Sequence, residues 1–257
     1  MNPHWRARYE MGIELTQQAA KKAQSFFDTR LAVEWKADES PVTIADRTTE
    51  QFLRERLTAA FPHDGFIGEE FASQPGESGF QWIIDPIDGT RNFLRGIPIW
   101  ATLVGLMERG ELIAGIVCNP NFNHTHHALR GEGAYRDGQR IRVSDRATLA
   151  ESAFCYTSMT LFLEIGLADR FVKLVQSTNH QRGFGDYYGY VMIAQGSMDV
   201  MVDRGVHIWD IAGPKVIVEE AGGMFTTWDG RTDLHATDVL VSNGKVHAQT
   251  QRLLAGD

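Results

Sequence analysis

The chain has 257 residues, of which 43% are hydrophobic and 23% charged, a composition typical of a compact globular protein of one domain or two closely packed ones. Its formal net charge of −8 argues against nonspecific nucleic-acid binding, which needs clustered lysine and arginine. The two cysteines, Cys118 and Cys155, are too few for a disulfide framework, and the sequence contains no apolar run long enough to span a bilayer. The segment after Met1 lacks the apolar core of a secretory signal, so we expect a cytoplasmic protein with no nucleic-acid or membrane partner.

The first half of the sequence predicts helices followed by a mostly antiparallel sheet. Apolar residues at three- and four-residue spacing indicate helices, and short apolar runs separated by glycine-containing turns indicate strands and hairpins. The expected elements are helices from about Trp5 to Phe27 and Asp46 to Ala60, buried strands at 66–67 and 82–84, hairpin strands at 102–107 and 112–117, and a further hairpin with turns at 131–133 and 137–138.

From Ala153 onward, the pattern indicates alternating strands and helices. The expected strands are 154–156, 198–202 and 239–242, and the expected helices are 168–176, 187–194 and 211–221. No low-complexity linker separates the two halves. We therefore predict a subdomain junction rather than a hinge, dividing the chain into residues 1–150, with the helices and antiparallel sheet, and residues 151–257, with the α/β part.

The sharpest chemical signal is the segment Asp85–Thr90. A hydrophobic strand leads into Asp85, and Pro86 lacks the N–H that a central strand needs, so we expect the strand to end and the chain to turn here. Two carboxylates would then lie three residues apart at a strand end. Gly89 permits close approach of the backbone to a ligand, and a helix beginning after Thr90 would direct free N–H groups to the same point, which suits a phosphate.

Two further acidic elements have the same character. Glu69 and Glu70 directly follow a short apolar strand, and Asp210 follows Trp209 at the start of a helix in which we expect Pro214 to lie early. Each feature alone has an ordinary explanation as a turn, a solvated surface or a helix cap. Together they indicate a metal centre, because oxygen ligands at three such places suit Mg²⁺ better than Zn²⁺. Bound cations would also explain how an acidic protein attracts a phosphate.

These segments resemble the signatures of the inositol-monophosphatase superfamily and occur in that family's order. The matching segments are Gly68–Glu70, Asp85–Phe93, Trp209–Gly213 and Glu219–Gly223, and the similarity extends from about Lys36 to Gly223, including 42–46 and 131–134. The resemblance implies an α/β (α+β) fold, a layered α-β-α-β-α sandwich of the inositol-monophosphatase/fructose-bisphosphatase type. It also implies a homodimer with metals bound between the two halves of each subunit.

The resemblance further implies a set of ligands for two Mg²⁺ ions per subunit, with a third ion held weakly near Glu69. The implied metal ligands are Glu69, Asp85, the Ile87 carbonyl, Asp88 and Asp210, and the implied phosphate-binding groups are Asp88 and the N–H groups of Gly89 and Thr90. Such a pair of ions activates a water and neutralises the leaving oxygen, so no protein nucleophile is needed.

The same resemblance gives Glu69 and Thr90 the task of orienting and deprotonating the attacking water. It also places Asp46 and Lys36 in the family's mobile loop near the metals, with a surface lysine as the alternative for Lys36. The presence of both Glu69 and Thr90 favours a phosphoric monoester hydrolase over a non-catalytic binding protein of the same fold. An aspartyl-phosphate enzyme is disfavoured because Asp85 and its partner carboxylate are one residue too far apart for the pattern D-x-D-x-T. An EF-hand fails because its alternating oxygen ligands are missing after Asp85.

Substrate specificity is expected to come from the second half of the chain. The segment Arg182–Tyr188, together with 95–102, resembles the histidinol-phosphate phosphatases of this superfamily, whereas inositol phosphatases usually have small residues where Asp186 and Tyr187 stand. This resemblance implies that Asp186 and Asp203 bind the amine or imidazole of L-histidinol phosphate. The expected substrate-binding residues are Arg182, Asp186, Tyr187, Asp203 and Asp210. The alternatives are an inositol-1-monophosphatase or related sugar phosphatase, with Asp186 as a helix cap.

Three histidines, His124, His126 and His127, raise the question of a zinc site. No cysteine or fourth partner is close to them in the sequence, so we expect exposed imidazoles instead. A bisphosphate nucleotidase is also disfavoured, because the sequence offers no basic cluster for a second phosphate.

Overall fold

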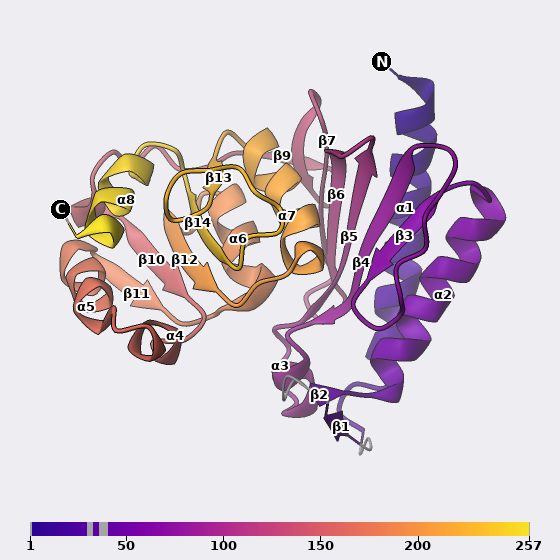
Figure 1. Ribbon diagram of the computed structural model, residues 1–257, viewed down its shortest axis with the longest axis horizontal. Helices are drawn as coiled ribbons and strands as arrows, with labels where there is room; N and C mark the ends of the chain where they lie inside the picture. Colours follow the sequence, from indigo (N-terminus) through magenta and orange to yellow (C-terminus); the bar gives the residue numbers. More distant parts are fainter. Residues whose placement is uncertain (1, 30–32, 36–40, 257) are drawn as a thin grey trace.

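The computed structural model describes residues 2–29, 33–35 and 41–256 (Figure 1). Lys36 lies outside the described residues, so its place near the metals stays a prediction. None of the helices described there has the length and hydropathy needed to cross a membrane.

A seven-stranded sheet forms the first half of the fold. Its strands, in spatial and chain order, are β3 (Gly65–Gly68), β4 (Phe80–Asp88), β5 (Ala101–Glu108), β6 (Glu111–Asn119), β7 (His124–Leu129), β8 (Gly133–Arg136) and β9 (Gln139–Ile141). β3 and β4 are parallel, and each later neighbouring pair is antiparallel. The predicted mostly antiparallel sheet is therefore confirmed.

A five-stranded sheet forms the second half, in the order β11-β10-β12-β14-β13. Its strands are β10 (Ala153–Tyr156), β11 (His180–Arg182), β12 (Val200–Arg204), β13 (Met224–Thr226) and β14 (Asp238–Ser242), and a separate small ribbon pairs β1 (Glu34–Trp35) with β2 (Pro41–Val42). The chain crosses from the larger sheet to this one through residues 142–152, which include a short 3₁₀ helix (Leu149–Glu151). The subdomain division near residue 150 stays a prediction.

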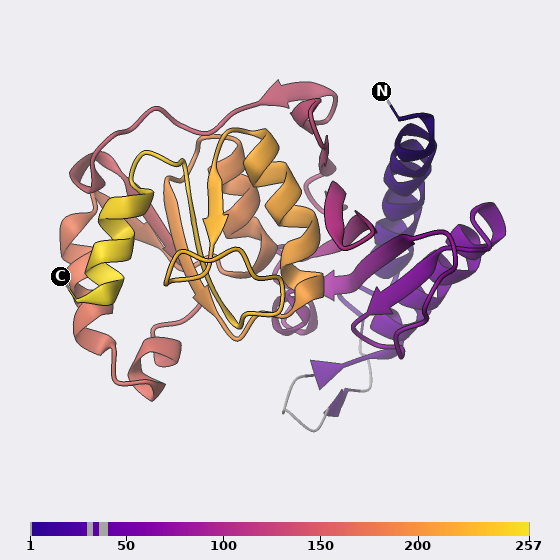
Figure 2. The ribbon, with the colours of Figure 1, turned by 45° about the horizontal axis from the view of Figure 1, so that its top comes forward.

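Helices complete the layers on and between the sheets (Figures 1 and 2). α1 (Pro3–Gln24) and α2 (Ile44–Ala60) pack on one face of the larger sheet, while α6 (Asp186–Ala194) and α7 (Ile208–Glu220) lie between the two sheets. α4 (Thr160–Glu164), α5 (Ala168–Ser177) and α8 (His247–Ala255) cover the outer face of the smaller sheet, and α3 (Thr90–Leu94) follows β4. This α-β-α-β-α layering confirms the predicted fold class.

The first helix begins at Pro3, directly after the N-cap residue Asn2. The Asn2 side chain accepts a hydrogen bond from the His4 N–H at 3.0 Å, and Pro3 occupies the first turn, where its missing N–H costs least. At the start of α2, the Thr43 side chain and the Asp46 carboxylate form a reciprocal capping box. This box explains why α2 begins at Ile44, two residues before the predicted start.

The strand that carries Asp85 does not end at Pro86, so that prediction is wrong. β4 continues to Asp88, which pairs with Ala101 of β5, and the register shifts between Asp85 and Asp88. A β-bulge accommodates the missing N–H of Pro86, because the residues of a bulge leave the regular ladder. The bulge also turns the strand without ending it.

Three glycines let α7 lie directly on the seven-stranded sheet. A Cβ on Gly115 of β6 would lie 2.1 Å from the carbonyl oxygen of Gly213 in α7, and a Cβ on Gly105 of β5 would lie 2.7 Å from the Ala212 Cβ. Gly213 itself faces two backbone carbonyl oxygens of the sheet at 3.1 and 3.2 Å from where its Cβ would be. The helix and the sheet therefore meet through backbone atoms, with no room for side chains between them.

Pro214 lies in the second turn of α7. The prediction that it lies at the start of the helix is therefore wrong. The helix begins at Ile208, before the apolar run that marked it, because His207 acts as the N-cap residue. The missing N–H of Pro214 leaves the carbonyl of Asp210 without its usual intrahelical donor.

Candidate active site

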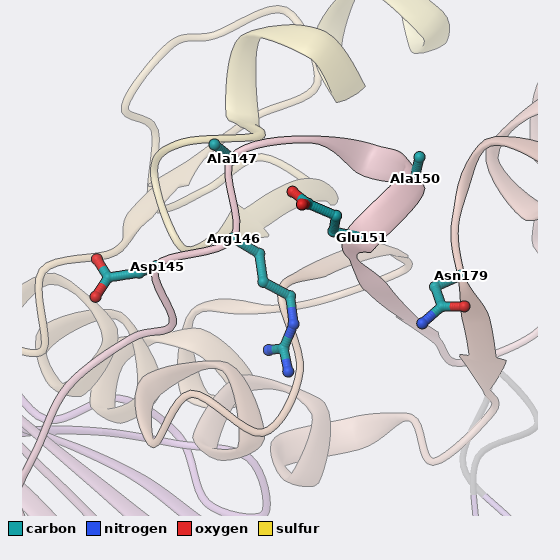
Figure 3. A pocket seen from close by; sticks show the side chains of 6 residues that line it. All are labelled: Asp145, Arg146, Ala147, Ala150, Glu151 and Asn179. Carbon is teal, nitrogen blue, oxygen red and sulfur yellow. The ribbon is translucent and has the colours of Figure 1, made fainter.

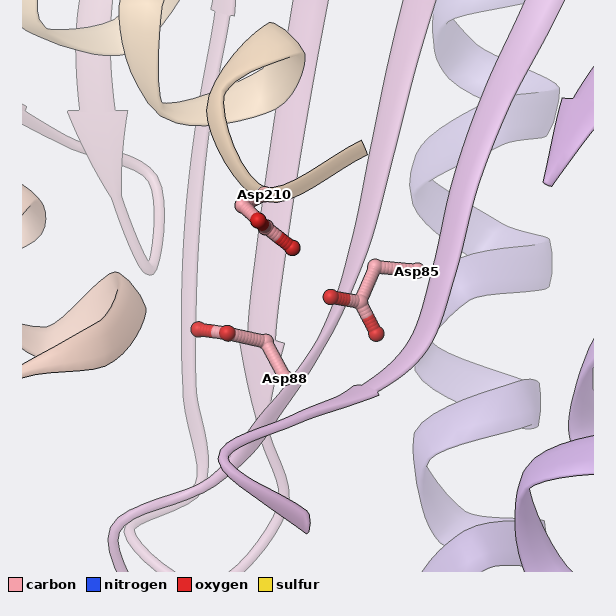
Figure 4. A group of neighbouring side chains, drawn as sticks. All are labelled: Asp85, Asp88 and Asp210. Atoms are coloured by element: carbon pink, nitrogen blue, oxygen red, sulfur yellow. The ribbon is translucent and has the colours of Figure 1, made fainter. Parts of the chain in front are cut away.

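Three aspartates that are far apart in the sequence meet at the centre of the molecule. Asp85 and Asp88 come from the bulged end of β4, and Asp210 comes from the first turn of α7 (Figure 4). One carboxylate oxygen from each lies within 4.8 Å of the other two. Asp85 and Asp88 are buried and Asp210 is half-buried. Within the described part of the chain, this is the one group of three or more His, Cys, Asp or Glu residues with the spacing of a metal site.

Backbone N–H groups orient each of these carboxylates. The Ile87 N–H donates to Asp85 Oδ1 at 3.0 Å, and the His207 N–H donates to Asp210 Oδ2 at 2.6 Å. The Tyr187 N–H, at the start of α6, donates to Asp88 Oδ2. The bulge and two helix starts thus fix the three groups before any ligand binds.

Charge repulsion makes this arrangement unfavourable without a cation. Burial raises the pKa of Asp85 well above its usual value, and the nearby charges of Glu69 and Asp88 raise it further. Burial likewise raises the pKa of Asp88, followed by the charges of Asp186 and Asp210. Because the donors are all carboxylate oxygens, the group fits a hard cation such as Mg²⁺.

Glu69 and Asp46 lie beside this group. Glu69 directly follows β3, its N–H donates to the Ile84 carbonyl at 3.2 Å, and its charge contributes to the raised pKa of Asp85. Asp46 is buried, with Oδ2 accepting hydrogen bonds from the N–H and hydroxyl of Thr43, while Oδ1 has no hydrogen-bond partner among the described residues. Burial raises the pKa of Asp46 to about 6. An unpaired buried oxygen next to acidic neighbours is a further sign that a cation or a water belongs here.

Gly89 forms the turn between β4 and α3, and Thr90 is the first residue of α3. Gly89 has φ 86°, a left-handed conformation that favours glycine, and its Cβ would lie 3.0 Å from the Ile99 carbonyl oxygen. The Thr90 hydroxyl donates to the Ile87 carbonyl at 3.0 Å. The helix expected after Thr90 is present as α3 and begins one residue earlier, at Thr90, so its first N–H groups lie beside the aspartates.

A small cavity of about 140 Å³ is lined by two of the three aspartates, Asp88 and Asp210, and by residues of the second half of the chain. Its lining includes four carboxylates, those of Asp88, Asp186, Asp203 and Asp210. Burial and the charge of Asp203 raise the pKa of Asp186 to about 7, and burial raises the pKa of Asp203 to about 6. The cavity therefore suits a ligand that carries positive charge.

Hydrogen bonds hold the two carboxylates of this cavity that do not belong to the three-aspartate group. Asp203 accepts from the Tyr190 hydroxyl at 2.9 Å and from the Arg204 N–H at 2.8 Å. Asp186 Oδ2 accepts from Asn92 Nδ2 at 3.1 Å. Asp186 is not the N-cap of α6; Gly185 is, without a side-chain cap, and Asp186 is the first helical residue. The start of α6 therefore gives no support to the alternative role of Asp186 as a helix cap, which stays an open alternative.

Two of the predicted substrate-binding side chains lie elsewhere. Arg182 is exposed on the edge strand β11, where its guanidinium donates to the Gln181 carbonyl. The Tyr187 ring is buried in the core and its hydroxyl accepts from the Asn119 side chain, so Tyr187 meets the site through its backbone N–H. Sequence reasoning also missed Asn92 and Tyr190. Asn92 stood within the matched segment Asp85–Phe93, whereas no pattern marked Tyr190.

The expectation that the three histidines of β7 are exposed is wrong. His126 is buried, and His124 and His127 are half-buried, because all three lie on a central strand. His126 contacts Gln195, and His127 contacts the Tyr9 hydroxyl. Burial lowers the pKa of His126 to about 4, which keeps it neutral at physiological pH.

A second cavity, of about 830 Å³, is lined by other residues (Figure 3). None of the predicted site residues lines it; its walls are formed by Asp145, Arg146, Ala147, Ala150, Glu151 and Asn179. Arg146 reaches inward to the buried carboxylate of Asp199, which also accepts hydrogen bonds from Ser144 and from the Ala153 N–H. These contacts fix the connection between the sheets.

Comparison with known proteins gives one consistent family. The model of the inositol monophosphatase family matches residues 4–256. A histidinol-phosphatase of Mycobacterium tuberculosis is 38% identical over 232 residues, which cover 88% of this chain and 89% of that protein. A fructose-1,6-bisphosphatase/inositol-1-monophosphatase of Aquifex aeolicus is 31% identical over 222 residues, which cover 84% of this chain and 82% of that protein.

The solved structures agree with this family. The crystal structure of extragenic suppressor protein suhB from Bartonella henselae matches with a TM-score of 0.91 at 28% identity, covering 96% of this chain and 98% of that one. The chain therefore belongs to the inositol monophosphatase family, and it is a phosphoric monoester hydrolase.

Proposed function

We propose that the protein is a Mg²⁺-dependent phosphomonoesterase that hydrolyses L-histidinol phosphate to L-histidinol. The observation that carries the proposal is the pair Asp186 and Asp203, two carboxylates beyond the three-aspartate group that line the same cavity. A neutral polyol would gain little from these charges, whereas a substrate with an ammonium or imidazolium group would neutralise them. The similarity to a histidinol-phosphatase supports the same substrate.

The proposed ligands of two or three Mg²⁺ ions are the groups inferred from the sequence: Glu69, Asp85, the Ile87 carbonyl, Asp88 and Asp210. When bound, Mg²⁺ would supply a water of lowered pKa and would neutralise the charge that develops on the leaving oxygen. The all-oxygen donor set and the unpaired Oδ1 of Asp46 support this assignment.

The chain's own groups would position the reactants around that centre. Glu69 and the Thr90 hydroxyl would orient the attacking water and accept its proton, with Asp46 supporting this task from α2. The N–H groups of Gly89 and Thr90 would hold the phosphate at the start of α3. Positioning and charge neutralisation are most of what phosphoryl transfer requires from a protein.

At the other end of the substrate, Asp186 and Asp203 would bind the amine or the imidazole. Roles for Arg182 and Tyr187 stay predictions, as do the homodimer and the cytoplasmic location. The competing candidate is an inositol-1-monophosphatase or related sugar phosphatase, which would use the same carboxylates as hydrogen-bond acceptors for hydroxyl groups.

A substrate panel separates these candidates. With purified protein and Mg²⁺, we expect L-histidinol phosphate to have a kcat/KM at least about tenfold above those of inositol 1-phosphate, fructose 1,6-bisphosphate and adenosine 3′,5′-bisphosphate. Asp186→Ala should remove most of that preference, because it removes one of the two charges facing the cation. Phosphate release measured at several substrate concentrations gives the ratios.

Asp229→Ala is the control for this panel, because Asp229 is an exposed aspartate that pairs with Arg231 and does not line the cavity. It should leave the ratios unchanged. A parent enzyme that prefers inositol 1-phosphate would contradict the histidinol-phosphate proposal and favour the sugar phosphatase.

The stabilisation by Mg²⁺ is expected to grow with pH. The pKa values of Asp46 and Asp203 are raised to about 6 and that of Asp186 to about 7, above their unfolded values. These groups therefore favour the metal-free fold at low pH, and that contribution is lost as pH rises from about 4 to 7. A bound cation offsets the repulsion between the ionised carboxylates and so restores the lost stability. The rise in Tm on adding Mg²⁺ should therefore be about 5 °C larger at pH 7.5 than at pH 5.5. Thermal unfolding with Mg²⁺ or with EDTA measures it.

Buried histidines make the total stability fall as pH falls, which is opposite to the effect of the carboxyl groups. The quantity to compare between the two pH values is therefore the rise in Tm caused by Mg²⁺. Burial lowers the pKa of His126 and of His247 to about 4, and their contribution is lost as pH falls through 6.5 towards 4. Neither belongs to the group that would bind the cation, so their contribution cancels in the difference. An equal Mg²⁺ effect at both pH values would argue against a carboxylate metal site.

A further inference from the structure

One side chain joins the segment that follows β4 to the proposed specificity residue in the other half of the chain. Asn92 lies in α3, two residues after Thr90, and its Nδ2 atom donates to the Ile99 carbonyl at 2.9 Å and to Asp186 Oδ2 at 3.1 Å. The orientation of the amide follows from its partners, since a carbonyl oxygen and a carboxylate oxygen can only accept. Asn92 thus bridges two segments 94 residues apart in the chain.

Both the backbone conformation of Asp186 and the charges around its carboxylate are unfavourable, so a hydrogen-bond partner stabilises its position. Its φ of 49° lies in the left-handed region, and it follows Gly185, whose φ is 64°. Asp203 and Asp210 repel its charge. Within the described part of the chain, Asn92 provides the one side-chain hydrogen bond recorded for this carboxylate. A strained backbone conformation such as that of Asp186 persists only where surrounding contacts hold it in place, and the hydrogen bond from Asn92 is such a contact.

The neighbouring contacts limit where the carboxylate can go. A Cβ on Gly89 would lie 3.3 Å from Asp186 Oδ2, so the carboxylate packs against the backbone of the β4–α3 turn. The next residue, Tyr187, is held through its N–H on Asp88. The backbone of α6 is therefore tied to the aspartate group, while the direction of the Asp186 side chain depends on Asn92.

We propose that Asn92 is a positioning residue for substrate specificity, which directs the Asp186 carboxylate into the cavity so that it meets the cationic end of the substrate. This inference rests on the proposed function in taking Asp186 as a group that faces the substrate. In this proposal Asn92 acts through Asp186 and has no direct role toward the reacting phosphate or the attacking water.

A double-mutant cycle tests the inference, using the variants Asn92→Ala, Asp186→Asn and the two combined. Asp186→Asn removes the charge but keeps an oxygen that can accept from Asn92, whereas Asn92→Ala keeps the charge and removes the donor. The measured quantity is the ratio of kcat/KM for L-histidinol phosphate to that for glycerol 2-phosphate, an ester without a cation. The Ki of free L-histidinol as a competitive inhibitor gives a second, binding-only measurement.

We expect Asn92→Ala to lower the ratio about tenfold and to raise the Ki of L-histidinol, as Asp186→Asn does. In the Asp186→Asn background, Asn92→Ala should add little, because no charge is left to direct. A ratio that Asn92→Ala leaves unchanged, or lowers equally in both backgrounds, would overturn the inference. Asn92→Ser, which is short but polar, repeats the test if Asn92→Ala does not fold.

Asn243→Ala is the matched control, since Asn243 is a buried asparagine whose amide donates to Ser144 and to the Arg146 carbonyl, away from the cavity. It should lower Tm without changing the ratio. The two proposals fail in different ways. The substrate panel with the parent enzyme decides whether L-histidinol phosphate is preferred, while non-additivity in the cycle decides whether Asn92 acts through Asp186, whichever ester is preferred.

Discussion

Asp85→Asn is expected to lower kcat by about a thousandfold or more and, at the same time, to raise the Tm of the metal-free protein. Turnover falls because the proposed cation loses a charged ligand. Stability rises because Asp85 is buried and the charges of Glu69, Asp88 and Asp210 raise its pKa, so a neutral side chain relieves repulsion. The amide oxygen can still accept from the Ile87 N–H, as Asp85 Oδ1 does. Thermal unfolding in EDTA and phosphate release in Mg²⁺ measure the two effects.

The matched control is Asp199→Asn, because Asp199 is an equally buried aspartate outside the site. Its carboxylate accepts from Ser144, Arg146 and the Ala153 N–H, so its charge is compensated. Neutralising it should lower Tm and leave kcat unchanged. If Asp85→Asn lowered Tm in EDTA as Asp199→Asn does, and Mg²⁺ still raised its Tm as in the parent, the three-aspartate group would not be the metal site.

Gly115→Ala is expected to destabilise the fold by about 3 kcal/mol or more, although the backbone of Gly115 is in a conformation that alanine adopts easily. The added methyl group would lie 2.1 Å from the Gly213 carbonyl oxygen, and both atoms belong to packed elements that cannot give way locally. The helix α7 would have to move away from the sheet, and Asp210 would move with it. Denaturant unfolding, together with the Mg²⁺ concentration for half-maximal activity, measures both consequences.

Gly110→Ala serves as its counterpart. Gly110 has φ 90° at the tip of the β5–β6 hairpin, and no atom lies within 4 Å of where its Cβ would be. The substitution therefore isolates backbone strain, worth about 1 kcal/mol, and should leave the Mg²⁺ requirement unchanged. Equal losses of stability in the two variants would show that the contact between α7 and the sheet is not tight.

The layers of the fold could be predicted from the sequence because periodicity and the matched segments carry them. The long apolar stripe of α1, the hairpin around Gly110 and the motif that contains Asp85 each occur where they were expected. The ends of individual elements were harder to predict, because local contacts there compete with the hydrophobic pattern. A bulge keeps β4 paired past Pro86, and His207 caps α7 earlier than its apolar run suggests. In both cases, a polar or backbone contact outweighs the pattern.

The contacts that cross between the halves could not be predicted, because neither partner marks the other in the sequence. Nothing near Asn92 indicates that its amide reaches Asp186, and nothing near Tyr187 indicates that its N–H meets Asp88 while its ring is buried. The burial of the three histidines could not be predicted either, because it comes from the central place of β7 in the sheet. Tertiary structure decides such questions, and a single sequence carries no record of it.

The glycine contact between α7 and the sheet fixes the spacing of the layers without using the residues of the proposed active site. Backbone atoms of β5, β6 and α7 set the spacing of the layers, and no carboxylate takes part in that spacing. Asp85, Asp88 and Asp210 can therefore be exchanged one at a time without changing that spacing, and an exchange that removes repulsion between them should stabilise the metal-free fold. A substitution that abolishes hydrolysis at the three aspartates should therefore leave the spacing of the layers unchanged.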